Sequence, residues 1–206
     1  MGVLSRLLRS CLRQVKHRRG AVHAIKNIAI CALLACTAGL FGFKTAAQAS
    51  PVGLSALLPS AQPAGRARLR VWGFEVYDAS LWVGPGFRQG DYASHPFALE
   101  LAYLRDFRGS DITRRSIDEM ARVGDFTPQQ AQAWSAALAE AMPDVQKGDR
   151  LTGIHQPGRG ALFLINGKPA GEVRDAQFSR LFFGIWLAPG TSEPRLRQAL
   201  LAGVPP

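Results

Sequence analysis

The 206-residue sequence predicts an α+β domain in which an antiparallel sheet is covered on one face by helices. Two strand-like segments come first, at 67–83 and 97–105, and two helical patterns follow between 110 and 142. Three further strands and two more helices occupy the rest of the chain. Strands and helices grouped into blocks are typical of α+β domains, whereas a regular alternation would indicate a parallel sheet.

Residues 1–49 have the composition of a secretory signal peptide. They contain eight basic residues and no acid, an apolar run from Ile28 to Phe43, and the small-residue sequence Ala47-Gln48-Ala49. We therefore expect cleavage after Ala49 and a periplasmic or secreted protein. Leu33-Leu34-Ala35-Cys36 loosely resembles a lipoprotein processing site, so lipid attachment at Cys36 is the alternative. An uncleaved anchor is disfavoured, because these 16 apolar residues are fewer than the roughly 20 that span a bilayer.

Removal of this leader changes what the charge of the chain implies. The whole sequence has a formal charge of +10, but residues 50–206 contain 17 basic residues against 15 acidic ones. A domain so nearly neutral gives no basis for nucleic-acid binding, and we expect membrane contact only through the leader. All three cysteines, Cys11, Cys31 and Cys36, also lie in the leader, so the remaining domain has no thiol for a disulfide or a metal.

The ordered domain is expected to span 65–206, after a tether or irregular first element at 50–64. Its first block, 67–83, is longer than an average strand and has Asp78-Ala79-Ser80 in its middle, so we interpret it as two strands or one bent strand. Gly84-Pro85-Gly86 ends this block. A polar loop then leads to a second long strand, Phe97–Arg105.

Two helices are expected next. The first has residues of its buried face at spacings of three and four, namely Ile112, Ser116, Met120 and Val123. Gly124 is a natural end for it. Thr127 precedes Pro128 and has Gln130 three residues later, which is the pattern of a capped helix start, and this second helix should run to Met142.

The following block returns to strands, at 150–155, 161–165 and 168–173. Asn166-Gly167 predicts a two-residue hairpin, because both residues tolerate the positive φ values that such a turn requires. Asp175 should start a helix that reaches Leu187 and is apolar around most of its circumference, so we expect it to be buried. A last helix begins near Ser192 and carries Leu196, Leu200 and Leu201 on one stripe.

Most catalytic and metal sites are disfavoured by the residues present. His95 and His155 are the only histidines after the leader and have no metal-binding spacing, so we expect neither a metal nor a cofactor. Without cysteine or a Gly-x-Ser-x-Gly elbow, no nucleophile is recognisable. The pair Arg114-Arg115 is interpreted as part of a solvent-exposed helix face.

A row of arginines is the strongest candidate for a binding site. Arg66, Arg68 and Arg70 alternate along the first strand and should share one face, which the residues at 72, 74 and 76 would continue inward. One interpretation places the arginines on the solvent face of an edge strand. The other turns Arg68 or Arg70 toward a cavity between sheet and helices, where a guanidinium binds a carboxylate with help from the hydroxyls of Tyr77 and Tyr103.

Four motifs in combination resemble the chalcone isomerase-like family, in its bacterial exported branch. They are Arg70-x-x-Gly-Phe-Glu-Val-Tyr-Asp-Ala-Ser-Leu-Trp82, Tyr103-Leu-Arg-Asp-Phe107, Lys147-Gly-Asp-Arg-Leu151 and Phe182-Phe-Gly-Ile-Trp-Leu187 with its following Pro-Gly-Thr-Ser. The resemblance covers about 65–201 and implies an open-faced β-sandwich, with a large antiparallel sheet, a helix layer and a ligand cleft between them.

The resemblance also implies which chemistry to expect. The catalytic arginine of the plant enzymes fits Arg68 or Arg70, but the other polar roles fall on Val76, on Asp111 or Ile112, on Asp118 or Glu119, and on Phe183 or Gly184. Four of five roles are thus missing or displaced, and no catalytic residue is assigned. Non-catalytic relatives resemble fatty-acid binders that keep an arginine and a tyrosine. We therefore expect a binding protein for a fatty acid or similar amphiphilic carboxylate, with a chalcone isomerase-type intramolecular lyase acting on a phenolic substrate as the alternative.

Overall fold

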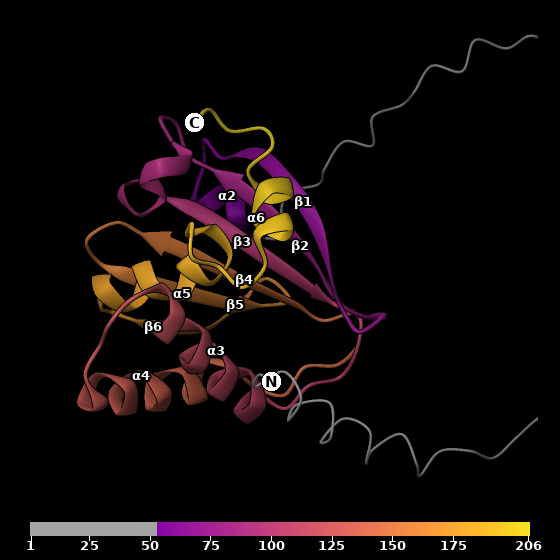
Figure 1. The fold of residues 1–206 in the computed structure, drawn as a ribbon, viewed down its shortest axis with the longest axis vertical. Coiled ribbons are helices and arrows are strands. Elements are labelled where there is room, and N and C mark those ends of the chain that lie inside the picture. Colours follow the sequence, from indigo (N-terminus) through magenta and orange to yellow (C-terminus); the bar gives the residue numbers. More distant parts are fainter. Residues whose placement is uncertain (1–52) are drawn as a thin grey trace, which may run out of the picture. The chain divides into compact units, whose positions relative to one another are not determined.

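The computed structural model describes residues 53–206. The expectations for the leader, including cleavage after Ala49 and lipid attachment at Cys36, lie outside these residues. The described elements follow one another along the chain as shown in Figure 1. They are α2 (Leu54–Leu57), β1 (Gln62–Val71), β2 (Phe74–Val83), η1 (Gln89–Ser94), β3 (Phe97–Tyr103), α3 (Gly109–Val123), α4 (Pro128–Ala141), β4 (Arg150–Gln156), β5 (Gly160–Ile165), β6 (Lys168–Val173), α5 (Ala176–Leu187) and α6 (Pro194–Leu200).

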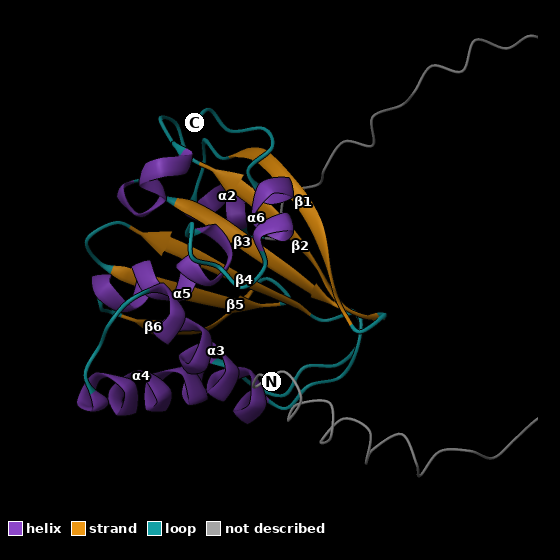
Figure 2. Cartoon of the chain, in the orientation of Figure 1, coloured by secondary structure: helices purple, strands orange, loops and turns teal. Residues whose placement is uncertain are grey.

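The six strands form one antiparallel sheet in sequence order, from β1 at one edge to β6 at the other. Strands that are neighbours in the chain are thus neighbours in the sheet, and the helices are inserted after β3 and after β6 (Figure 2). This arrangement confirms the expected α+β class with an antiparallel sheet. The hairpin turn expected at Asn166-Gly167 joins β5 to β6, and both of its residues have positive φ.

The helices α3, α4, α5 and α6 pack on one face of the sheet, and the short α2 lies on the other. Neighbouring residues of β2 show the alternation, since Leu81 packs in the large core under the helices and Trp82 packs against Leu54 and Leu58. Strand residues with odd and even positions therefore enter two different cores. The helix-side core includes Leu81, Leu99, Leu101, Met120, Leu138, Leu151, Phe163, Phe178, Leu181 and Phe182.

The break in the first strand block differs from the expected one. Trp72-Gly73 forms a two-residue turn between β1 and β2, with Val71 paired to Phe74, whereas Asp78-Ala79-Ser80 lies within β2. The arginine row therefore ends at Arg70 instead of continuing inward. Trp72 and Phe74 are exposed at 61% and 44%, so the prediction that they run on into the interior is wrong.

The sequence signals for α4 and α5 correspond to the observed helices. Thr127 caps α4, with its hydroxyl accepting from the backbone N–H of Gln130 while the Gln130 side chain accepts from the backbone N–H of Thr127. The helix α5 is buried on most sides, as its composition predicts. Residues 53–64 form an ordered first element, because α2 places Leu54 and Leu58 in the core of the second sheet face.

Candidate functional site

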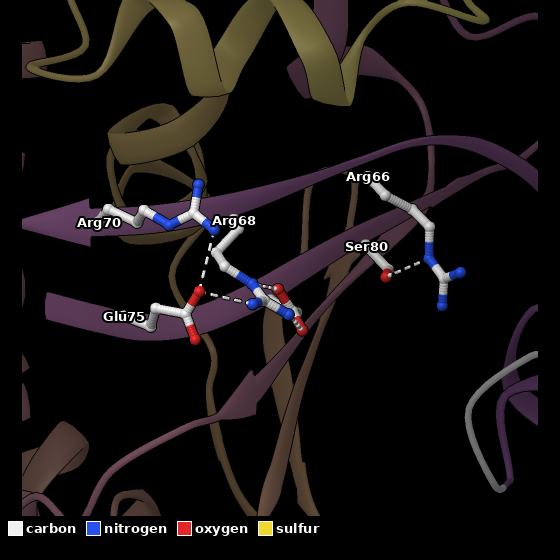
Figure 3. Close-up of polar contacts among 6 residues, drawn as sticks. Arg66, Arg68, Arg70, Glu75 and Ser80 are labelled. Carbon is white, nitrogen blue, oxygen red and sulfur yellow. Dashed lines mark hydrogen bonds and ion pairs between the residues drawn. The ribbon is translucent and has the colours of Figure 1, made fainter. Parts of the chain in front are cut away.

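The arginines of β1 are bound to acidic and polar side chains of β2 (Figure 3). Arg68 donates to both oxygens of Asp78, at 2.6 and 2.8 Å, and to Glu75 at 2.7 Å. Arg70 donates to the same Glu75 oxygen at 2.9 Å, so this carboxylate lies between two guanidiniums. The hydrogen bonds from Arg70 and Arg68 lower the pKa of Glu75. The hydrogen bonds to Asp78 and Glu75 raise the pKa of Arg68. Arg66 makes a longer contact of 3.3 Å with the Ser80 hydroxyl.

The arginines and the two tyrosines lie on opposite faces of the sheet. Ala67 and Leu69 pack with the helix-side core, and Leu69 is paired with Tyr77, whereas Arg68 is paired with Asp78 on the other face. The expectation that Arg68 or Arg70 turns into the space between sheet and helices is therefore wrong. The structure has the alternative arrangement, an exposed charged row on an edge strand, which also hinders edge-to-edge pairing.

Tyr77 and Tyr103 are brought together under the helices. They are paired residues of β2 and β3, and their rings meet edge to face with centroids 6.1 Å apart. The Tyr77 hydroxyl accepts a 2.9 Å hydrogen bond from the indole Nε1 of Trp186 on α5. Within residues 53–206, the Tyr103 hydroxyl has no hydrogen-bond partner. Removal from water raises the pKa of both phenols, so both remain protonated at neutral pH.

A charged group that sequence reasoning missed lies on α3, on the side turned toward the protein. Glu119 is only 5% exposed and forms ion pairs with Arg115 and, at 3.6 Å, with Arg122. The Arg115 side chain is 25% exposed, and its Nη1 is buried without a hydrogen-bond partner in the described part of the chain. Removing a guanidinium nitrogen from water without a partner is costly, and this makes Arg115 a candidate binding residue.

The expectation of a solvent-exposed arginine pair holds for only one of its members. Arg114 is 59% exposed and pairs with Asp111 at 2.5 Å, whereas Arg115 lies on the neighbouring, more buried side of α3. The spacing of Arg115, Glu119 and Arg122 by four and three residues was the available signal. It places three charged residues beside the apolar stripe of the helix and thus at the edge of the buried face.

The charges of Arg115 and Glu119 affect the pKa values of Tyr77 and Glu193. Burial is the largest cause of the raised pKa of Glu193, and the charge of Glu119 raises it further while Arg115 opposes the shift. The pKa of Tyr77 is raised by burial and lowered by its hydrogen bond from Trp186, with smaller contributions from the charges of these same groups. We call this set the Tyr77 cluster. It consists of Tyr77, Tyr103, Arg115, Glu119, Trp186 and Glu193.

The Tyr77 cluster offers hydrogen-bond donors and little basic chemistry. Arg115 Nη1 and the Tyr103 hydroxyl are hydrogen-bond donors without partners among residues 53–206. A tyrosine with a raised pKa is a poor general base. Of the positions assigned by the family resemblance, Glu119 is buried whereas Asp118 is exposed, and Val76 supplies no hydroxyl.

An open groove lies between α3 and α4, and none of the residues that line it belongs to the Tyr77 cluster. This open groove has a volume of about 450 Å³ and is lined by Ser110, Thr113, Arg114, Ile117, Asp118, Ser135, Ala136 and Ala139.

In the described part of the chain, no group of three or more His, Cys, Asp or Glu side chains is arranged to hold a metal. None of the described helices is long and apolar enough to cross a membrane.

Comparison with known proteins supports the fold. Residues 64–202 match the family model described as chalcone isomerase-like. An uncharacterized protein of Haemophilus influenzae is 30% identical over 141 residues, covering 68% of this chain and 67% of the relative. The crystal structure of an Arabidopsis thaliana fatty-acid binding protein superimposes with a TM-score of 0.55 at 11% identity, covering 69% of this chain and 87% of the other. The chain therefore belongs to the chalcone isomerase-like family.

Proposed function

We propose that this protein binds an amphiphilic carboxylate, such as a fatty acid, between α3 and the sheet. The observation that carries the proposal is the buried Nη1 of Arg115, which has no hydrogen-bond partner in residues 53–206. A carboxylate would complete the hydrogen bonding of this guanidinium. The fatty-acid binding of the Arabidopsis protein of the same fold is consistent with this class of ligand.

The surroundings of Arg115 suit both ends of such a ligand. The Tyr103 hydroxyl is a second donor that stays protonated at neutral pH, because burial raises its pKa. Tyr103 also contacts the rings of Tyr77 and Phe107, with centroids 6.1 and 5.7 Å away. These rings supply apolar surface against which an acyl tail gains free energy by leaving water. In this proposal the headgroup anchor is Arg115, in place of Arg68 or Arg70.

Binding without ring-closing catalysis is the expected activity. Val76 carries no hydroxyl, and the raised pKa values of Tyr77 and Tyr103 disfavour the phenolates that a proton-abstracting mechanism would use. We therefore expect no conversion of chalcones by the purified protein. Turnover that disappears in Arg115→Gln would instead establish the alternative, an intramolecular lyase.

The binding site is tested by displacement of a fluorescent fatty acid with palmitate. Arg115→Gln should weaken binding by about tenfold to a hundredfold, the range for a lost charge-assisted hydrogen bond. Arg114→Gln, on the next residue and exposed, is the matched control and should bind as the wild type does. Equal affinity of the wild type and Arg115→Gln would overturn the proposed anchor.

Two further variants separate binding from folding. Arg115→Gln leaves Glu119 buried without its closest partner, so Arg115→Gln/Glu119→Gln removes both charges and should fold while still binding weakly. Tyr103→Phe deletes only a hydroxyl that has no partner in the described residues, and should reduce affinity without reducing stability. Loss of binding in Arg68→Ala, with binding retained in Arg115→Gln, would move the site to the other sheet face.

We also propose that the protein is exported and cleaved after Ala49, on the evidence of its leader sequence. The intact mass and N-terminal sequence of protein recovered from the periplasmic fraction test this directly. A mature chain that begins at Ser50 is expected. A lipid-modified chain beginning at Cys36, abolished by Cys36→Ala, would establish the lipoprotein alternative.

A further inference from the structure

Two exposed aromatic side chains occur together at the tip of the β1–β2 hairpin. Trp72 and Phe74 are 61% and 44% exposed, and among the described residues the remaining large exposed apolar side chain is Leu57, at 44%. Leu57 belongs to α2, which packs near Trp82 and thus at the opposite end of β2 from the tip. In Figure 1 the tip projects at the edge of the domain, beside the end of β3.

The backbone at Trp72 disfavours a tryptophan. Trp72 and Gly73 have φ values of 51° and 81°, and Asn166 and Gly167, in the other two-residue hairpin of this chain, have 51° and 79°. Positive φ at both central residues favours Asn-Gly, which is the sequence of the second hairpin. A bulky side chain at this φ is an outlier. Neither local conformation nor burial among residues 53–206 explains the tryptophan, which is the choice expected of a side chain that makes a contact beyond the described residues.

Two arginines lie close to the two aromatic residues, and one of them, Arg70, is ion-paired with Glu75. The guanidinium of Arg105 lies 4.9 Å from the centroid of the Phe74 ring, and the side chain of Arg70, two residues before Trp72, is 60% exposed. Asp106 accepts a hydrogen bond from the backbone N–H of Lys147. The hairpin with these neighbours contains five basic residues against four acidic ones, a net +1. They are Arg66, Arg68, Arg70, Arg105 and Lys147 against Glu75, Asp78, Asp106 and Asp149.

The shape and chemistry of this tip fit a lipid surface better than a protein partner. Specific protein interfaces bury roughly 1,200–2,000 Å², and two side chains on a narrow turn provide only a small part of that area. An indole ring beside arginines is instead typical of the membrane interface, where aromatic rings sit at the level of the headgroups and guanidiniums attract anionic lipids.

We propose that the tip of the β1–β2 hairpin, with Trp72 and Phe74 flanked by Arg70 and Arg105, docks the protein on an anionic lipid surface. Trp72 enters the headgroup layer, and the arginines bind lipid phosphates. This goes beyond the carboxylate-binding function and beyond the expectation that only the leader contacts a membrane. With this docking surface, the same domain would carry both a binding site for an amphiphile and a surface that contacts a membrane, where amphiphiles are found.

Tryptophan fluorescence of the full chain measures this docking selectively. Of the four tryptophans, only Trp72 is exposed, since Trp82, Trp134 and Trp186 are at most 8% exposed. Vesicles of phosphatidylcholine mixed with phosphatidylglycerol should therefore shift the emission to the blue, and brominated lipids should quench it. Vesicles of phosphatidylcholine alone should give a much smaller change, because the attraction of the arginines is then lost.

Trp72→Asn is the decisive variant, because it restores the residue that this turn favours and should fold at least as well as the wild type. It should lose the blue shift and the quenching. Leu57→Asn removes an equally exposed apolar side chain at the other end of β2 and should leave both signals unchanged. Arg70→Gln should weaken binding to the anionic vesicles about fivefold.

Three results would overturn the proposal. The first is an emission spectrum that neither vesicle changes, and the second is an equal response to both vesicle compositions. The third is a wild-type dimer that Trp72→Asn converts to a monomer without any vesicle effect, since the tip would then bind a second copy. The carboxylate site is tested separately, because Tyr103→Phe should leave vesicle binding intact even where it reduces fatty-acid affinity.

Discussion

The indole Nε1 of Trp186 donates a 2.9 Å hydrogen bond to the hydroxyl of Tyr77 and so joins α5 to β2 across the helix–sheet interface. The neighbouring phenol of Tyr103, in edge-to-face contact with Tyr77, has no such partner in residues 53–206. Two tyrosines in similar surroundings therefore differ: Tyr77 joins two elements of the fold, and Tyr103 contributes to ligand binding in the function that we propose.

Tyr77→Phe is expected to destabilise the domain by about 1–3 kcal/mol, because it leaves a buried indole N–H without an acceptor. Tyr103→Phe should be close to neutral, because the hydroxyl that it removes makes no hydrogen bond within the described residues. Urea denaturation of both variants measures the difference. Equal losses of stability in the two variants would contradict this assignment.

Gly65→Ala is expected to disturb the contact between β1 and α6. A Cβ at Gly65 would lie 2.3 Å from the Ala199 carbonyl oxygen and 2.4 Å from that of Leu200, both of which are backbone atoms. Overpacking of this kind costs about 1–3 kcal/mol, which a thermal or urea unfolding curve detects. Gly90→Ala is the control, because a Cβ there would meet nothing within 4 Å.

His155 should make stability depend on pH on the acidic side of neutrality. Its Nε2 bonds to the Ala93 carbonyl at 2.8 Å and its Nδ1 to the Ser179 hydroxyl at 2.6 Å. Burial lowers the pKa of His155, and the hydrogen bond to Ala93 only partly opposes this. The unfolded chain then binds a proton near pH 6.5 while the folded chain does not, so stability falls as pH decreases from about 6.5 toward the lowered pKa.

His155→Gln tests this dependence, because glutamine retains hydrogen-bonding groups but does not titrate. The variant should be less stable at neutral pH and should lose less additional stability on acidification than the wild type. Free energies of unfolding measured by urea at several pH values give the comparison. Parallel pH profiles for the two proteins would show that another group is responsible.

Glu193 should act in the opposite sense. Burial and the charge of Glu119 raise its pKa, so the folded chain holds this proton to higher pH than the unfolded chain does. Stability is therefore lost as pH rises from the ordinary glutamate value of about 4.3 through the raised pKa. Glu193→Gln should stabilise the protein at neutral pH and lose this advantage in acid. A gain of the same size at every pH would indicate a cause other than ionisation.

The elements with local chemical signals could be predicted from the sequence. Thr127 and Gln130 form the expected reciprocal cap of α4, and Asn166-Gly167 forms the expected turn. Both patterns work over a few residues, so no information about the rest of the fold is needed.

The turn at Trp72-Gly73 could not be predicted in the same way. Tryptophan carries no turn signal, and the aromatic residues that follow it are typical of a strand, so the alternation of Arg66, Arg68 and Arg70 was extended past the true end of β1. The expected inward row was wrong for this reason. Trp72, which gave no turn signal, is also the residue whose exposure makes the hairpin tip a candidate docking surface.

By itself, the sequence determined the order and type of the six strands and of α3 to α6, because hydrophobic periodicity, caps and turn residues act over short distances along the chain. It did not indicate α2 or η1, which lie in the expected tether and in the expected polar loop. Only the tertiary structure decided which side of each element faces the helix layer. Arg68 and Leu69 are adjacent in β1, and Arg114 and Arg115 are adjacent in α3, yet the members of each pair lie in different environments. Side-chain direction changes with every residue, and only packing between distant segments determines which direction is buried.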